Sequence, residues 1–182
     1  MKILAVVGSL RDGNTKYLVE ETVKAIENIE NIQIEKIYLS NIKMNFCNGC
    51  LSCDETGKCI FEDDMSDIVV KAKNSNAFIF ATPARWGLLS GEIKTFLDRL
   101  NPLAINEELK GKKAILFSVG QSAEEESESI HLAVKSLSIF CENAGIEVVD
   151  SVAICGCYNK KDAVNKTDYI NKCKSAGYKL IK

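Results

Sequence analysis

Four cysteines within one short segment form the densest group of reactive side chains in this sequence of 182 residues. They follow the spacing C-x2-C-x2-C-x5-C, as Cys47, Cys50, Cys53 and Cys59, inside a loop predicted over residues 44–61. Four thiolates on a short flexible loop can hold one cubane iron–sulfur cluster, because each ligand has to reach a different iron. The spacing therefore makes these cysteines candidate ligands of a [4Fe–4S] cluster.

Three other states of these thiols remain open from the spacing alone. Structural zinc sites usually separate their cysteine pairs by a longer loop, so zinc is the weaker metal interpretation. The cysteines could also be unligated thiols or form a redox-active disulfide. A structural disulfide is not expected, because thiols stay reduced in the cytoplasm, where we expect this chain to reside.

The amino-terminal segment has the composition of a phosphate-binding turn. An apolar run over residues 3–7 predicts a buried strand, and Gly8 and Gly13 follow it before a predicted helix over residues 16–28. The hydroxyls of Ser9 and Thr15, the charge of Arg11 and the free N–H groups of a helix start all favour an anion. The alternative is an ordinary strand-to-helix turn that binds nothing.

The glycine spacing in this turn restricts the kind of phosphate. It does not match G-x-G-x-x-G, and no G-K-[ST] follows, so neither a dinucleotide nor a nucleoside triphosphate motif is supported. A phosphate monoester such as that of FMN fits what remains.

A second polar turn follows the third predicted strand and reads T-P-A-R-W-G. Pro83 and Gly87 shape an irregular backbone, and Trp86 offers a face on which a planar ring could stack. Arg85 could stabilise negative charge on a reduced flavin. The alternative is a plain connection with a surface Trp and Arg.

Strand and helix patterns alternate along the whole chain, which we treat as a single domain over residues 1–182. Strands are predicted at 3–7, 32–39, 77–81, 114–119 and 146–154. Helices are predicted after each of them: at 16–28, from an acidic start at 62–64 through Met65, Ile68, Val69 and Ala72, at 91–100 with Pro102 as its stop, from a capping box of Ser122 and Glu125 to Gly145, and at 162–181. This alternation predicts an α/β fold, a three-layer doubly wound parallel sheet of five strands in the order 2-1-3-4-5. Because all loops that follow strands lie at one edge, the loops at 8–15, 44–61, 83–91 and 120–122 should converge there.

Two of these motifs together resemble one known family. G-S-x-R-x-G-N-T after the first strand and T-P-x-x-W-G-x-x-S-G-x-x-K-x-F-x-D-R after the third resemble the flavodoxin-like NAD(P)H-dependent FMN reductases over essentially the whole chain. The cysteine spacing resembles the iron–sulfur flavoproteins within that family. The resemblance implies a flavodoxin-like fold that binds FMN at the carboxyl edge of the sheet.

The resemblance also assigns roles to individual residues. It implies that Ser9, Arg11, Asn14 and Thr15 hold the phosphate. It implies that the isoalloxazine ring is lined by Pro83, Ala84, Arg85, Trp86 and Gly87, and that its pyrimidine side faces Gly120, Gln121 and Ser122. Many members have Tyr where this chain has Arg85.

The remaining chemistry-bearing residues receive plainer interpretations. Cys141 and Cys173 fall on apolar helix faces and are expected in the core. Cys155 and Cys157 end the fifth strand, at the opposite edge of the sheet from the strand that leads into the cysteine loop, so no shared metal is expected. His131, the only histidine, is expected in solvent. No side-chain general base is expected.

Composition excludes several classes of partner. The chain has 23 basic and 25 acidic residues without a basic stripe, so nucleic acid is not expected. No apolar run reaches membrane length, so a soluble cytoplasmic protein is expected.

The interpretation we favour is an FMN-dependent oxidoreductase that passes electrons between FMN and a [4Fe–4S] cluster. NAD(P)H or a reduced ferredoxin-type carrier would be the electron donor, and the resemblance implies a homodimer or homotetramer. The alternatives are an NAD(P)H-dependent FMN or quinone reductase without a cluster, and a non-enzymatic module that uses flavin or metal for sensing or structure.

Overall fold

A computed structural model describes all 182 residues apart from the side chain of Glu125. Five parallel strands form one sheet in the order β2-β1-β3-β4-β5, which confirms the predicted doubly wound fold. The strands are β1 Lys2–Val7, β2 Gln33–Tyr38, β3 Ala77–Pro83, β4 Lys113–Val119 and β5 Glu147–Ile154. The helices are α1 Asn14–Ile26, α2 Ser52–Thr56, α3 Met65–Asn74, α4 Gly91–Asp98, α5 Asn101–Ile105, α6 Glu128–Asn143 and α7 Thr167–Leu180.

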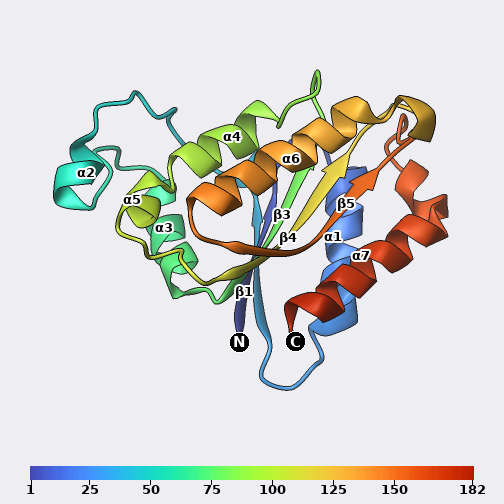
Figure 1. Cartoon of the computed structure of the whole chain (residues 1–182), viewed down its shortest axis with the longest axis horizontal. Helices are drawn as coiled ribbons and strands as arrows, with labels where there is room; N and C mark the ends of the chain where they lie inside the picture. The colour runs from blue at the N-terminus through green and yellow to red at the C-terminus, as the bar shows by residue number, and fades with distance from the viewer.

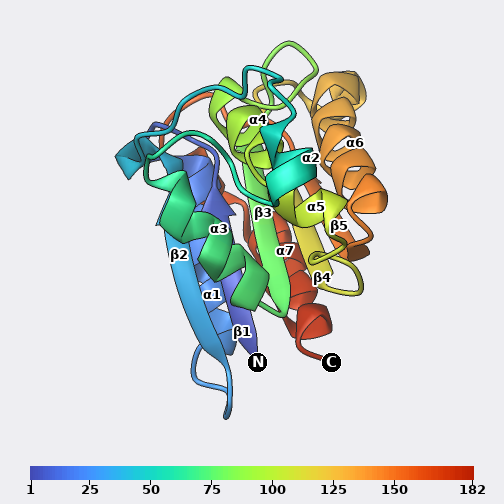
Figure 2. The same cartoon turned by 90° about the vertical axis from the view of Figure 1, so that its left-hand side faces the viewer.

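Helices cover both faces of the sheet, and the alternation of side chains along each strand produces two apolar layers. In β1, Ile3, Ala5 and Val7 pack under α1 and α7, whereas Leu4 and Val6 pack under α3, α4 and α6. Figures 1 and 2 show the three layers that result. None of the described helices is both long and apolar enough to cross a membrane.

The predicted start of the helix after β4 is wrong. α6 begins at Glu128, and a 3-10 turn over Glu124–Glu126 precedes it. The reason lies in the end of β5: Gly156 N–H donates to the Ser122 carbonyl at 2.8 Å, which ties this segment to the neighbouring strand and not to a helix. The predicted capping partner, the Glu125 side chain, lies outside the described residues.

The role of Pro102 and the start of the last helix also differ from the prediction. Pro102 lies in the first turn of the short helix α5, where proline is tolerated, and α4 has already ended at Asp98. The last helix is preceded by a 3-10 turn over Asp162–Asn165 and begins at Thr167, because Lys166 has a non-helical backbone.

Candidate functional site

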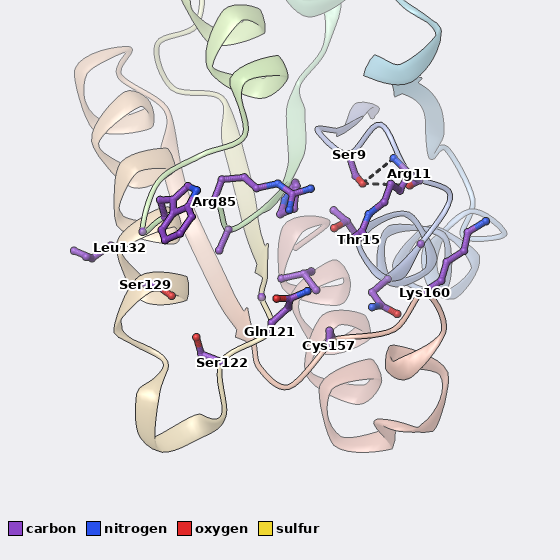
Figure 3. A pocket seen from close by; sticks show the side chains of 18 of the residues that line it. Ser9, Arg11, Thr15, Arg85, Gln121, Ser122, Ser129, Leu132, Cys157 and Lys160 are labelled. Atoms are coloured by element: carbon purple, nitrogen blue, oxygen red, sulfur yellow. Dashed lines mark hydrogen bonds between the residues drawn. The ribbon is translucent and has the colours of Figure 1, made fainter.

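A cavity of about 690 Å³ opens at the carboxyl edge of the sheet, over the point where the strand order reverses between β1 and β3 (Figure 3). Its size is typical of a small-molecule site. All twelve residues predicted to contact a flavin line it, namely Ser9, Arg11, Asn14, Thr15, Pro83, Ala84, Arg85, Trp86, Gly87, Gly120, Gln121 and Ser122. Three of the four loops expected at this edge therefore do meet.

The first of these loops presents hydroxyls and a helix start to the cavity. The Ser9 hydroxyl accepts the Arg11 N–H and donates to the Arg11 carbonyl, each at 3.2 Å, so it folds the turn back on itself (Figure 3). α1 begins at Asn14, and the N–H groups of a first helical turn have no partner within the helix. The turn thus combines a positive helix end with the buried hydroxyl of Thr15.

Asn14 connects this turn to the far end of the chain. Its amide nitrogen donates to the Asn159 carbonyl at 2.7 Å, and its amide oxygen accepts the Ala163 N–H at 3.1 Å. Both polar ends of this side chain are therefore engaged by the loop between β5 and α7. That loop also brings Lys160 and Cys157 to the cavity wall (Figure 3).

Sequence reasoning assigned no ligand role to Lys160 or Cys157, and it missed Glu128, Ser129 and Leu132, which line the cavity from the start of α6. None of these residues belongs to a local motif. Lys160 is brought to the cavity by a hydrogen bond of Asn14, which lies more than a hundred residues earlier in the chain.

The turn between β3 and α4 is a tight two-residue hairpin. Arg85 and Leu88 exchange backbone hydrogen bonds of 2.9 Å, and the two residues between them have positive φ, 51° for Trp86 and 78° for Gly87. A tryptophan in this left-handed conformation costs about 1 kcal/mol, and such conformations recur at ligand sites. The turn holds the indole fully exposed at the cavity rim, while Arg85 extends into the cavity (Figure 3).

Gly8 sets the distance between the first loop and its neighbours. A Cβ at this position would lie 2.7 Å from Ile93 Cβ and 3.0 Å from the Ala81 carbonyl oxygen. The Gly8 N–H donates to that same carbonyl at 2.7 Å, and the Ser90 hydroxyl donates to the Gly8 carbonyl at 2.6 Å. The backbone here has no room to move away from an added methyl group.

We therefore expect Gly8→Ala to lower the free energy of unfolding by about 1–3 kcal/mol, the usual cost of overpacking. Gly91→Ala is the matched control, because a Cβ there meets nothing within 4 Å in the first turn of α4. It should leave stability unchanged or raise it by up to about 1 kcal/mol. Urea unfolding followed by circular dichroism measures both, and equal stabilities of the two variants would contradict this account.

The cysteine loop lies elsewhere, which corrects the prediction that all four loops converge. Among the described residues, none from 44–61 lines the cavity. Figure 1 shows the loop and α2 beyond α4 and α5, away from the ends of β4 and β5. The reason is a long-range ion pair: Arg99, just after α4, binds Asp63 at the end of the loop and the Asn45 carbonyl at its start.

The four cysteines surround a small cavity of their own, of about 40 Å³. Its wall also includes Phe61, Arg99 and Asn101, and the Asn101 amide donates to the Cys53 sulfur at 3.2 Å. Within the described residues, no three His, Cys, Asp or Glu side chains are grouped to hold a single metal ion. The thiols thus lie around one space instead of meeting at one point.

The Arg99–Asp63 pair is almost completely buried, with side-chain exposures of 1% and 7%. Burial raises the pKa of Asp63, but hydrogen bonds from the Arg99 guanidinium and from Asn45 outweigh this effect and lower the pKa to about 2. A carboxyl group with a depressed pKa contributes stability above its ordinary pKa and loses it as the pH falls through the folded value.

The contribution of Asp63 to stability should therefore disappear between about pH 4 and pH 2. The shift from 3.8 to about 2 corresponds to about 2 kcal/mol. We expect the difference in unfolding free energy between the wild type and Asp63→Asn to shrink by about this amount from pH 5 to pH 2. Urea titrations at both pH values measure it, and a difference independent of pH would contradict the assignment.

The remaining cysteines are buried. Cys141 and Cys173 lie in the two apolar layers, as predicted, and burial raises the pKa of each thiol to about 12. Cys157 is also buried, which raises its pKa to about 11, although it lines the larger cavity. These three cysteines are therefore protonated thiols at neutral pH.

Comparison with known proteins gives the following matches. A sequence model described as NADPH-dependent FMN reductase matches residues 1–156. An iron-sulfur flavoprotein of Methanocaldococcus jannaschii is 38% identical over 123 residues, which cover 67% of this chain and 63% of that protein. An iron-sulfur flavoprotein of Archaeoglobus fulgidus is 34% identical over 113 residues, which cover 62% of this chain and 51% of that protein.

These alignments span about half to two thirds of the length of the two relatives. Among solved structures, an FMN-dependent NADH-azoreductase from Bacillus anthracis in complex with FMN superposes with a TM-score of 0.72 at 14% identity, and the match covers 100% of both chains. At this identity, the likeness concerns the fold.

Proposed function

This chain belongs to the NADPH-dependent FMN reductase family, and from that premise we propose that it is an FMN-dependent oxidoreductase that exchanges electrons between FMN and a [4Fe–4S] cluster. FMN binding is proposed from the large cavity, because a helix start, hydroxyls and cations meet there beside an exposed indole. The two relatives named iron-sulfur flavoproteins support the assignment, and the azoreductase of the same fold was solved in complex with FMN.

The residues of the cavity fit FMN in two parts. We assign the phosphate to the N–H groups of the first turn of α1, the hydroxyls of Ser9 and Thr15, and the charges of Arg11 and Lys160. Asn14 would contribute its backbone N–H, because its side chain is engaged by Asn159 and Ala163.

The ring is assigned to the hairpin at residues 83–87, with its pyrimidine side towards residues 120–122. Bound FMN would supply the redox chemistry, accepting or giving one or two electrons. Arg85 would stabilise negative charge on the reduced ring, and the backbone N–H groups of the two turns would orient it. No step requires a side-chain base.

For the cluster, we assign Cys47, Cys50, Cys53 and Cys59 as the four ligands. Thiols spread around one apolar space suit a cubane, whose ligands each reach a different iron, better than a single zinc ion. A buried guanidinium nitrogen of Arg99 without a partner among the described side chains borders the same space. Such a donor suits the sulfur atoms of an anionic cluster.

Because the two cavities lie apart within one chain, an oligomer would be needed to bring a cysteine loop close to an FMN. Phe46, Leu51 and Ile60 are exposed on the cysteine loop, and Trp86, Leu88 and Leu132 are exposed around the larger cavity. We infer a homodimer or homotetramer in which one chain's cysteine loop lies near another chain's FMN. Burying these side chains would favour such an assembly.

NAD(P)H or a reduced ferredoxin-type carrier would supply the electrons. The experiment that tests the proposal is anaerobic purification, with iron, sulfide, zinc and flavin quantified per chain. About four irons and four sulfides beside one FMN are expected. Flavin without iron would instead favour the second candidate, an NAD(P)H-dependent FMN or quinone reductase, which the family match alone also supports. Failure of both NAD(P)H and reduced ferredoxin to bleach the flavin would favour a non-enzymatic module.

Trp86 gives a direct test of flavin binding, because it is the single tryptophan of the chain and lies fully exposed at the rim of the cavity. Adding FMN to the flavin-free protein should quench most of the tryptophan emission and saturate at one FMN per chain. Riboflavin, which lacks the phosphate, should need at least about 100-fold higher concentration for the same quenching. Unchanged emission at saturating FMN would contradict the placement of the ring.

A further inference from the structure

One buried arginine connects the two ends of the cysteine loop. The Arg99 Nη1 donates to the Asn45 carbonyl at 2.8 Å and to Asp63 Oδ2 at 2.7 Å, and Nη2 donates to Asp63 Oδ1 at 2.9 Å. Asn45 precedes the first of the four cysteines, and Asp63 follows the last. Arg99 therefore fixes both ends of the segment that carries the thiols onto the end of α4.

The contacts around Arg99 are specific to a guanidinium. Its side chain is 1% exposed, and it grips the carboxylate with two parallel hydrogen bonds, the fork geometry that lysine cannot reproduce. The Phe61 ring, which also lies in the loop, packs 5.1 Å from the guanidinium carbon. A guanidinium buried this deeply requires a compensating partner for each of its N–H groups.

One nitrogen of this guanidinium has no such partner. Nε is buried and, within the described part of the chain, makes no hydrogen bond. Arg99 and Cys59 line the same small cavity. The guanidinium with the unpartnered nitrogen and the Cys59 thiol thus border one small space.

We propose that Arg99 is a positioning residue for the cluster. Arg99 closes the cysteine loop through Asn45 and Asp63, and it donates its Nε–H to the Cys59 sulfur. This inference rests on the proposed function, because it requires the cluster. Four thiolates bring more negative charge than the cubane core compensates, and one-electron reduction adds another negative charge. A buried cation beside one sulfur therefore stabilises the reduced cluster and raises its reduction potential.

Redox titration of the anaerobically purified holoprotein, followed by electron paramagnetic resonance, tests this with two opposed variants. Arg99→Lys keeps a positive charge but removes the Nε–H and the fork, so the cluster should become about tenfold harder to reduce, a shift of about 59 mV for one electron. Asp63→Asn keeps Arg99 and removes a neighbouring anion, so the potential should rise. The flavin potential should stay constant in both variants, because FMN is assigned to the other cavity.

Two controls separate this role from loop closure alone. Lys73→Gln removes an exposed cation paired with Glu108 and should change neither potential. Limited proteolysis of the cluster-free proteins should cut the loop faster in both Arg99→Lys and Asp63→Asn. If Arg99 only closed the loop, both variants would lose iron together, without shifts of opposite sign.

Wild-type cluster potential in Arg99→Lys would overturn the proposal. If that variant does not fold, Asp63→Asn decides alone: a raised potential supports the proposal, and an equal or lowered one overturns it. Wild-type protein that takes up no iron or sulfide would defeat the assigned cluster itself, which is a different failure from an unshifted potential in a loaded variant.

Discussion

Replacing Thr15 with aspartate is expected to abolish FMN binding while leaving the fold intact. Thr15 is buried in the first turn of α1 and lines the cavity, so the new carboxylate would face the phosphate directly. Two like charges about 4 Å apart repel by about 4 kcal/mol at the effective dielectric of a protein surface, which corresponds to about a thousandfold loss of affinity. Titration calorimetry with FMN measures the loss.

Loss of FMN binding in Thr15→Asp would not be explained by a weakened helix. An acidic residue in the first turn of a helix interacts favourably with the helix dipole, so Thr15→Asp should not weaken α1. Thr15→Ser is the matched control, because it keeps the hydroxyl, and it should bind FMN within about threefold of the wild type. The phosphate assignment would be refuted by a Thr15→Asp protein that keeps wild-type affinity.

Replacing Cys59 with alanine is expected to remove the cluster without affecting the flavin. A cubane that loses one of its four thiolates is open to solvent at one iron, so the iron content should fall from about four per chain to below one. FMN content should remain at one per chain, because no described residue of the cysteine loop lines the larger cavity. Iron, sulfide and flavin analysis of the anaerobically purified variant provides the measurement.

Alanine is chosen because a serine hydroxyl could replace the thiolate as a ligand. Ser52→Ala, in the same loop, is the control and should keep both cofactors. Equal iron content in the wild type, Cys47→Ala and Cys59→Ala would mean that these thiols are not ligands. One zinc per chain in place of iron would point to the structural zinc interpretation.

Local sequence patterns predicted the sheet and most of the cavity wall. The apolar runs of β1 and β3 and the turns that follow them are short-range features, and the parallel sheet brings their ends together. The residues that were missed depend on contacts between distant parts of the chain. Lys160 is positioned through Asn14, and the start of α6 is displaced because Gly156 hydrogen-bonds to Ser122.

The position of the cysteine loop could not be predicted for the same reason. Its spacing identified four candidate ligands, and the structure places them around one space. What draws the loop away from the other three is the pairing of Asp63 with Arg99, and no periodicity or motif encodes that choice of partner.

The hydrogen bonds of Asn14 also set an order of events during synthesis. The turn after β1 is completed by Asn159 and Ala163, which are synthesised 145 and 149 residues after Asn14. A nascent polypeptide that has not yet reached residue 159 lacks both hydrogen bonds of the Asn14 side chain. We therefore expect a chain cut before residue 159 to lack this support and to bind the proposed FMN more weakly than the full chain.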